Sequence, residues 1–204
     1  RSEVAVKVLP FHLVEQEPGI VRRFFREAQA AARIHSPHLV AVHDVNSDRG
    51  LYYIVMEYVH GVSAGAHLKR LISEGAVGLA ETDALDLSIA ATRGLAAAHE
   101  QGIVHRDIKP DNILVPGVQG GEGLDFKAAK LSDLGFARGE GLGQSLTEFA
   151  QGMGTIGFVS PEQSQDARSA KKPADVFSMG ATLYALLAGR APFTGEGMMQ
   201  VLKA

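Results

Sequence analysis

The sequence predicts an α+β fold in which a small sheet comes first and a mainly helical region follows. Three observations predict it. Apolar side chains occupy every second position in residues 4–9, which is typical of a strand. Residues 82–101 are rich in Ala and Leu, as in a long helix. The pattern changes near residue 60, so we expect one unit at residues 1–59 and a second at residues 60–204.

The first unit has the pattern strand, helix, strand, strand. Residues 4–9 form the first strand, with Val repeating on one of its faces. Residues 20–34 place apolar side chains at helical spacing, which predicts one helix. Two further strands are expected at residues 38–45 and 51–58, separated by a polar turn at residues 46–50. Together these elements form a small sheet with one helix.

The second unit is mainly helical. A short helix is expected at residues 66–73. The long helix at residues 82–101 has Thr82 as its expected N-cap and Gly102 as the residue that ends it. Residues 174–188 are almost wholly apolar, which predicts a helix that is buried on all sides.

Irregular segments separate these helices. Residues 113–115 and 126–131 are short, strand-like runs. The Gly-rich residues 117–123 between them lack the spacing of a phosphate-binding loop, so we expect an enlarged hairpin turn. Residues 135–160 are rich in Gly and show little periodicity. They predict a long loop, and long loops are often functional.

Composition excludes several classes of function. The 204 residues are 46% hydrophobic and 21% charged, which is typical of a globular protein. The net charge of -3 provides no basic field for nucleic acid or for an anionic membrane. The absence of Cys excludes disulfides and thiolate metal sites. No apolar run reaches the ~18 residues of a membrane span. Because the chain starts without Met and stops within an apparent helix, we expect a piece of a longer protein.

Two charged residues of the first unit fall on apolar faces. Glu27 lies within the apolar stripe of the first predicted helix, and Lys7 shares a strand face with the small Ala5. A buried carboxylate without a partner costs about 3–5 kcal/mol, so a Lys7–Glu27 ion pair would satisfy both groups. Alternatively, the helix is rotated slightly and both charges are solvated. The pattern alone leaves both arrangements open.

A dense polar segment at residues 105–112 directly precedes an apolar run. Asp107 and Asn112 are five residues apart, so they can converge on one site if the segment is a loop. Asp133 follows another apolar run and is close to a Gly. Carboxylate and amide oxygens suit Mg²⁺ and not Zn²⁺. A magnesium site with few protein ligands points to a phosphate-bearing substrate.

These motifs carry a resemblance to a known family. His105-Arg106-Asp107-Ile108-Lys109-Pro110-Asp111-Asn112 resembles the catalytic loop of eukaryotic-type (Hanks-type) serine/threonine protein kinases. Val4-Ala5-Val6-Lys7 resembles their lysine strand, and Asp133-Leu134-Gly135 their magnesium loop. Ser160-Pro161-Glu162 resembles the triplet that closes their activation loop. All four occur in the family's order and span essentially the whole chain.

The resemblance implies a protein-kinase-like bilobal fold. The β-rich N-lobe would occupy residues 1–59 and the larger, mainly helical C-lobe residues 60–204, both truncated. The family's Gly-rich loop would precede this chain, and its C-terminal helices would follow. Leu134 stands where the family usually has Phe, and Ser160 where it usually has Ala. Neither change removes a catalytic group.

The resemblance also implies ATP and Mg²⁺ as cofactors. Lys7, held by Glu27, would pair with the α- and β-phosphates of ATP. The residues that would contact the adenine ring are Ala5 and Leu114, on its two faces, and Glu57 and Val59, through their backbones.

The catalytic groups are implied in the same way. Asp107 would orient the substrate hydroxyl and accept its proton, and Lys109 would stabilise the phosphoryl group in transfer. Asn112 and Asp133 would hold Mg²⁺. Thr155 would form hydrogen bonds near Asp107 and Lys109, as in serine/threonine kinases. A lysine at position 109 favours serine/threonine over tyrosine specificity.

Regulation would act through the long loop. In the family an arginine such as Arg106 often receives a phosphate from the activation loop. Ser145 and Thr147 are the hydroxyl candidates, and both could instead be plain loop residues. Gln151 stands where many relatives carry the acceptor. Self-association for trans-autophosphorylation is a further expectation.

Structural roles are expected for three more residues. Asp175 at the start of the apolar helix could stabilise the helix dipole by about 0.3–1 kcal/mol. The resemblance implies that it also binds backbone amides of the catalytic loop, and the two roles are compatible. His105 and Glu162 belong to motifs with structural or regulatory roles in the family.

The sequence therefore predicts a serine/threonine protein kinase that phosphorylates proteins. The run Pro161-Glu162-Gln163 favours a bacterial origin. The alternative is a pseudokinase or scaffold that binds partners through the same fold, although every catalytic group named above is present. A small-molecule phosphotransferase is disfavoured by the long activation segment. We expect the kinase domain in the cytoplasm, where ATP is, with any membrane anchor outside this chain.

Overall fold

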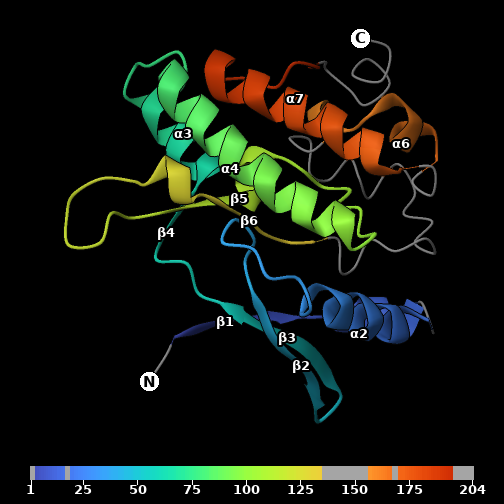
Figure 1. Cartoon of the computed structure of the whole chain (residues 1–204). Coiled ribbons are helices and arrows are strands. Elements are labelled where there is room, and N and C mark those ends of the chain that lie inside the picture. The colour runs from blue at the N-terminus through green and yellow to red at the C-terminus, as the bar shows by residue number, and fades with distance from the viewer. Residues whose placement is uncertain (1–2, 17–18, 135–155, 167–169, 195–204) are drawn as a thin grey trace.

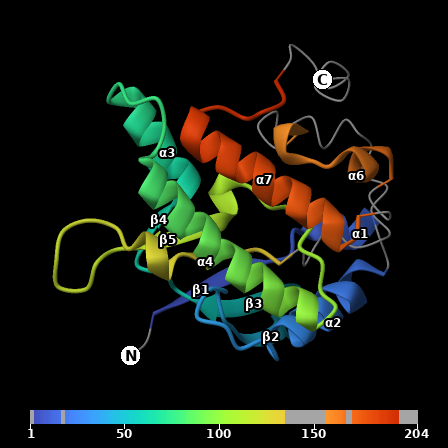
Figure 2. The same ribbon diagram turned by 45° about the horizontal axis from the view of Figure 1, so that its top comes forward.

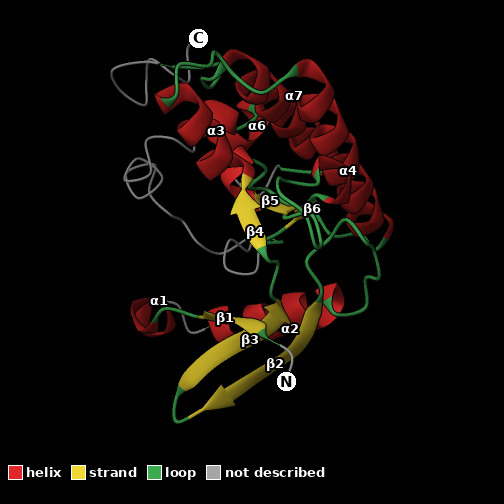
Figure 3. Cartoon of the chain, turned by 90° about the vertical axis from the view of Figure 1, so that its left-hand side faces the viewer, coloured by secondary structure: helices red, strands yellow, loops and turns green. Residues whose placement is uncertain are grey.

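A computed structural model of the chain describes residues 3–16, 19–134, 156–166 and 170–194. The described part is a mixed α+β fold (Figure 1). A three-stranded sheet with its helix lies at one end of the molecule, and the long helices lie at the other end (Figure 3). This arrangement confirms the predicted fold class. The division into lobes at residues 59 and 60 stays a prediction.

The first sheet is antiparallel, and its strand order is β1-β3-β2. Its elements are β1 (Val4–Val8), α2 (Ile20–Ala31), β2 (Val42–Asp48) and β3 (Leu51–Glu57). Ala5 and Lys7 share the more buried face of β1, whereas the Val side chains of the other face are exposed. The strict alternation of the sequence therefore places Lys7 on the inner side of the sheet.

The turn between β2 and β3 is shorter than expected. Asn46 pairs with Tyr53 and Asp48 with Leu51, so residues 46–48 belong to the strand. Only Arg49 and Gly50 make the turn, and both have positive φ angles, of 48° and 81°. Two-residue turns with positive φ match the twist of paired strands, which explains why the hairpin extends this far.

Residues 38–40 are not part of this sheet, contrary to the prediction of a strand from residue 38. The N–H of Leu131 donates to the carbonyl oxygen of His38 at 2.9 Å, and the N–H of Val40 donates to that of Leu131 at 3.0 Å. These bonds connect the segment between α2 and β2 to Leu131 in the second part of the chain. A Cβ at Gly94 would lie only 2.2 Å from the His38 carbonyl oxygen, so this approach requires a glycine.

Two of the described helices, α6 (Pro161–Gln165) and α1 (Phe11–Gln16), were not predicted from the sequence. With five and six residues, each makes fewer than two turns. A segment this short shows no helical period, so pattern analysis cannot detect it.

The second part of the chain combines helices with a small antiparallel sheet of order β4-β5-β6. Two long helices, α4 and α7, lie side by side (Figure 1 and Figure 2). The described elements are β4 (Gly61–Ser63), α3 (Ala64–Ser73), α4 (Glu81–Glu100), β5 (Ile113–Pro116), β6 (Lys130–Leu131), α6 (Pro161–Gln165) and α7 (Lys172–Ala188). Three short 3-10 turns are also described, namely η1 (Pro110–Asn112), η2 (Phe126–Ala128) and η3 (Ile156–Phe158).

The start of α4 differs from the prediction. Ala80, and not Thr82, is the N-cap, and its side chain cannot cap the helix. The preceding Leu79 donates its N–H to the carbonyl oxygen of Leu186 in α7 at 2.8 Å. This tertiary bond holds the residue before the N-cap against α7, and no side chain caps the first turn of α4. At the other end, Gly102 adopts a positive φ of 74°, as a residue that ends a helix does.

Two further expectations were wrong. Residues 126–128 form a 3-10 turn and not a strand, because the Asp125 carboxylate accepts the N–H groups of Lys127 and Ala128. Helix α7 is not buried on all sides, since Val176 is 64% exposed. The expected enlarged hairpin is confirmed, with Val118 donating its N–H to the Gly123 carbonyl oxygen at 3.1 Å.

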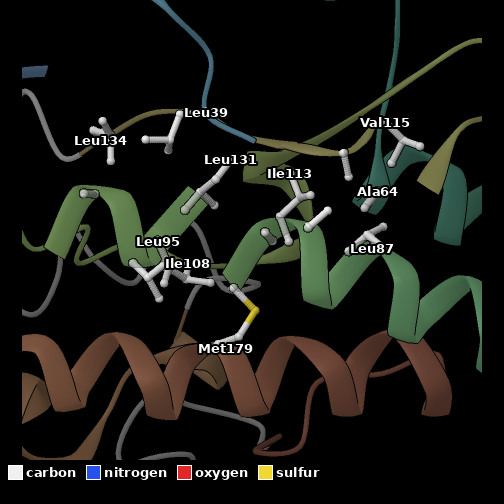
Figure 4. Packing of buried hydrophobic residues seen from close by; sticks show 14 of the residues in the cluster. Leu39, Ala64, Leu87, Leu95, Ile108, Ile113, Val115, Leu131, Leu134 and Met179 are labelled. Atoms are coloured by element: carbon white, nitrogen blue, oxygen red, sulfur yellow. The ribbon is translucent and has the colours of Figure 1, made fainter. Parts of the chain in front are cut away.

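A continuous apolar core supports the polar loop at residues 105–112. Figure 4 shows Leu87 of α4, Met179 of α7, and Ile113 and Leu131 of the small sheet together with Ile108. Ile108 belongs to the loop itself and is 1% exposed. Fully burying such a side chain contributes about 1.5–3 kcal/mol, so one apolar residue anchors the loop between its charged neighbours.

Candidate active site

Strands β5 and β6 bring two polar segments of the chain together. Ile113 pairs with Leu131, so the chain before β5 and the chain after β6 lie at the same edge of the sheet. Ser132 donates both its N–H and its hydroxyl to the Asn112 carbonyl oxygen, at 2.9 and 3.0 Å. Asn112 and Asp133 are therefore held near each other, and their role as magnesium ligands stays a prediction.

The Asp107 carboxylate is oriented by two neighbours in its own loop. The Lys109 ammonium lies 3.2 Å from Oδ2 of Asp107. Nδ2 of Asn112 donates to the same oxygen at 2.9 Å and to the Asp107 carbonyl oxygen at 2.7 Å. The Asp107 and Lys109 side chains are only 11% and 16% exposed. Because the amide nitrogen of Asn112 serves Asp107, its amide oxygen is the atom that can bind a cation.

Lys7 reaches the site from the first sheet. Its ammonium lies 2.5 Å from Oδ1 of Asp133, and both side chains are a little over one-third exposed. Asp133 has a positive φ of 60°, which is uncommon for a residue with a side chain. Glu27 is half-buried on α2. The predicted Lys7–Glu27 pair stays a prediction.

A buried carboxylate supports the loop from α7. Asp175 is 1% exposed, and its two oxygens accept the N–H groups of His105 and Arg106, each at 2.8 Å. His99 of α4 places Nε2 2.7 Å from the same carboxylate. His99 was not predicted from the sequence, because nothing in the local pattern connects the last turn of one helix with the first turn of another.

His105 is fully buried, and its contacts suit the neutral ring. Its Nδ1 accepts the N–H of Asp107 at 3.3 Å, and its Nε2 lies 2.8 Å from the Ser132 carbonyl oxygen. A neutral ring with its proton on Nε2 satisfies both contacts. Burial lowers the pKa of His105 below its ordinary value, which favours this form. The ring thereby connects the loop of Asp107 with the residue before Asp133.

A second ion pair joins β3 to β6. The Lys130 ammonium lies 2.8 and 2.9 Å from the two carboxylate oxygens of Glu57. Glu57 also accepts the N–H of Ala41 at 3.2 Å. This pair fixes the end of β3, where the adenine ring is expected. Glu57 was expected to bind the adenine ring through its backbone, and Lys130 was not predicted as a partner of its side chain.

The other expected adenine contacts lie on neighbouring elements. Ala5 is half-buried on β1, Leu114 is half-buried on β5, and Val59 is half-buried just after β3. Their contacts with a nucleotide stay predictions.

Three expected residues lie outside the described part of the chain. These are Thr155 and the two candidate phosphorylation sites, Ser145 and Thr147. Glu162 is described and lies in the first turn of α6, on the exposed side. Arg106 is half-buried in the loop of residues 105–112.

The donor set fits a magnesium ion. Asn112 and Asp133 supply one amide oxygen and one carboxylate from adjoining segments. Mg²⁺ is typically bound by one or two protein oxygens together with substrate phosphates and waters. Within residues 3–16, 19–134, 156–166 and 170–194, no group of three His, Cys, Asp or Glu side chains could hold a metal by itself. Over the same ranges, no helix is long and apolar enough to span a membrane.

Comparison with known proteins finds one family. A family model described as the protein kinase domain matches residues 1–204. The chain is 35% identical over 199 residues to the serine/threonine-protein kinase PrkC of Bacillus subtilis, covering 98% of this chain and 28% of PrkC. It is 38% identical over 209 residues to PknB of Mycobacterium tuberculosis, covering 98% of this chain and 30% of PknB. The chain thus spans less than a third of these relatives.

Solved structures give a similar result. The PknI kinase domain of Mycobacterium tuberculosis matches with a TM-score of 0.69 and 26% identity, over 93% of this chain and 65% of that one. Rad53 in complex with AMP-PNP matches with a TM-score of 0.70 and 26% identity, over 98% of this chain and 45% of that one.

Proposed function

Because this chain belongs to the protein kinase domain family, we propose that it transfers the γ-phosphoryl group of ATP to Ser and Thr hydroxyls of proteins. The geometry of Asp107 carries the proposal. Its carboxylate is fixed by Lys109 and Asn112 and is mostly screened from solvent. A carboxylate held in this way can orient a hydroxyl and accept its proton at the moment of transfer.

The cations around Asp107 supply the electrostatic part. Lys109 lies next to the proton acceptor, so it would stabilise negative charge on the phosphoryl group in transfer. Lys7 would pair with the α- and β-phosphates, with Glu27 holding it in place. Asn112 and Asp133 would hold Mg²⁺, which when bound neutralises charge on the phosphate oxygens. The contact between Lys7 and Asp133 supports this assignment, because it brings the expected phosphate-binding ammonium next to an expected magnesium ligand.

The nucleotide would lie between the two sheets. Ala5 and Leu114 would contact the two faces of the adenine ring, and Glu57 and Val59 would bind its edge through their backbones. The Glu57–Lys130 pair supports this assignment, because it fixes the strand end that would carry those backbone groups. The relative Rad53 was crystallised with AMP-PNP.

Regulation belongs to the same proposal. Phosphorylation of Ser145 or Thr147 would supply an anion for Arg106, and a second copy of the chain would serve as the phosphorylating enzyme. Thr155 would form hydrogen bonds near Asp107 and Lys109. The kinase domain would act in the cytoplasm, where ATP is.

Phosphopeptide mass spectrometry after incubation with Mg-ATP tests the proposal. The full-length protein is compared with Asp107→Asn and with Asp111→Asn, which changes a half-exposed carboxylate of the same loop that contacts Lys69. We expect new phosphate on Ser or Thr in the wild type and in Asp111→Asn, and none in Asp107→Asn. A wild type that binds ATP and transfers no phosphate would contradict the proposal and favour a pseudokinase.

A further inference from the structure

Arg106 occupies an unfavourable backbone conformation immediately before Asp107. Its φ angle is 64°, in the left-handed region that a side chain normally avoids. Such a conformation persists only where the surroundings fix it, and it is common at functional sites. The groups that fix Arg106 therefore also fix the start of Asp107.

Both backbone polar groups of Arg106 are held by side chains from distant elements. Its N–H donates to Oδ1 of Asp175 at 2.8 Å. Its carbonyl oxygen accepts from Nε2 of Gln163 at 2.8 Å. Gln163 is 57 residues away in the sequence, lies in α6, and is 8% exposed. The catalytic loop is thus hydrogen-bonded at Arg106 both to α7, through Asp175, and to α6, through Gln163.

Gln163 is itself held firmly. The fully buried Ser160 caps α6, and its hydroxyl oxygen accepts the N–H of Gln163 at 3.3 Å. Just before this cap, the carbonyl oxygen of Phe158 accepts the hydroxyl of Ser178 in α7 at 2.7 Å. The backbone at Gln163 is therefore fixed by these contacts, and its side-chain amide can hold the loop of residues 105–107 in place.

We propose that Gln163 is a positioning residue for Asp107, an inference that rests on the proposed function. The Arg106 carbonyl and the Asp107 N–H belong to one peptide group. Gln163 binds the carbonyl, and Nδ1 of His105 accepts the N–H at 3.3 Å. Together they set the plane of the peptide from which the Asp107 side chain projects. The end of the activation segment is thereby connected to the proton acceptor by one hydrogen bond.

Replacing Gln163 with Met tests the hydrogen bond while nearly preserving side-chain volume. Gln165→Met is the matched control, because Gln165 lies on the same helix and is exposed. In full-length protein we expect kcat to fall about 3- to 10-fold in Gln163→Met, as for one lost hydrogen bond. The KM for ATP should change less than about 2-fold, because Gln163 contacts no proposed ATP-binding residue. Gln165→Met should match the wild type.

Gln163→Glu separates positioning from general damage to the fold. A charged carboxylate cannot donate to the Arg106 carbonyl, whereas a protonated one can. The kcat of Gln163→Glu relative to wild type should therefore rise as the pH falls from 8 to 5.5. If the buried charge acts only by destabilising the fold, the folded fraction measured by circular dichroism should rise in parallel with kcat, and that result would overturn the positioning role. Either a ratio that stays constant with pH or an unchanged kcat in Gln163→Met would overturn the proposal.

Hydrogen–deuterium exchange tests independently of activity whether Gln163 holds the loop of residues 105–107. Amides of residues 105–107 should exchange several-fold faster in Gln163→Met than in Gln165→Met. Equal exchange in the two variants would overturn the positioning role. If the wild type transfers no phosphate, the proposed function fails, while these exchange rates still decide whether Gln163 holds the loop.

Discussion

Replacing Asp175 with Asn should sharply destabilise the fold. The carboxylate is 1% exposed, accepts the N–H groups of His105 and Arg106 at 2.8 Å, and lies 2.7 Å from Nε2 of His99. Asn keeps the shape of the side chain but loses the charge. It also turns an NH₂ group toward at least one donor, which leaves that donor without an acceptor in a buried place.

The expected loss follows from the number and burial of these bonds. A hydrogen bond to a charged group contributes about 1.5–3 kcal/mol, and Asp175 accepts two from the backbone alone. Breaking a buried charged network typically costs about 3–5 kcal/mol. We therefore expect the free energy of unfolding, measured by urea titration, to fall by about 3–5 kcal/mol in Asp175→Asn.

Asp125→Asn is the matched control. Asp125 also accepts two backbone N–H groups, from Lys127 and Ala128 at 3.1 and 3.2 Å, but it is exposed. Because Asn caps a turn as well as Asp does, its effect should stay within about 0.5 kcal/mol. Equal and small losses in both variants would refute the reasoning that the buried carboxylate of Asp175 holds the loop.

Three further predictions rest on separate contacts. Lys130→Met removes the partner of Glu57, so ATP affinity measured by calorimetry should fall about 2- to 5-fold; unchanged affinity would show that the pair does not shape the adenine site. The pKa of His105 is lowered in the folded state, so the unfolded chain binds more protons and the free energy of unfolding should fall as the pH drops below about 6.5. This fall should be smaller in His105→Gln in urea titrations, and identical pH dependence would contradict the assignment. Gly94→Ala should lower the free energy of unfolding by about 1–3 kcal/mol, because its Cβ would clash with the His38 carbonyl oxygen. Gly180→Ala, with open space around it, should not destabilise α7. Equal effects of the two substitutions would show that the approach of Gly94 to His38 is unimportant.

Local patterns in the sequence predicted most of the elements. The alternation around Lys7 predicted β1 and placed Lys7 on the face of Ala5, opposite the Val side chains, because a strand has a fixed period of two. It left open whether that face is buried. Errors arose where tertiary contacts overrode local signals. Residues 38–40 bond to β6 and not to the first sheet. Helix α4 starts just after Leu79, which bonds to α7, and Thr82 is not its N-cap.

The site could be predicted only as far as its residues cluster in the sequence. Asp107 and Asn112 lie in one loop, so their convergence was foreseeable. His99, Lys130 and Gln163 contact residues 57 to 76 positions away, and each contact depends on how separate elements pack. No periodicity or spacing in a single sequence carries that information.

The transfer of labelled γ-phosphate from ATP to a protein substrate tests most directly whether Asp107 is the centre of a protein kinase. Rates are measured for full-length wild type and for Asp107→Asn at saturating Mg²⁺, with ATP affinity measured in parallel by calorimetry. We expect kcat to fall about 100-fold or more in Asp107→Asn, while the affinity for ATP changes less than about 2-fold. Equal transfer rates in the two proteins would contradict the catalytic role of Asp107, and ATP binding without any transfer by the wild type would contradict the kinase assignment.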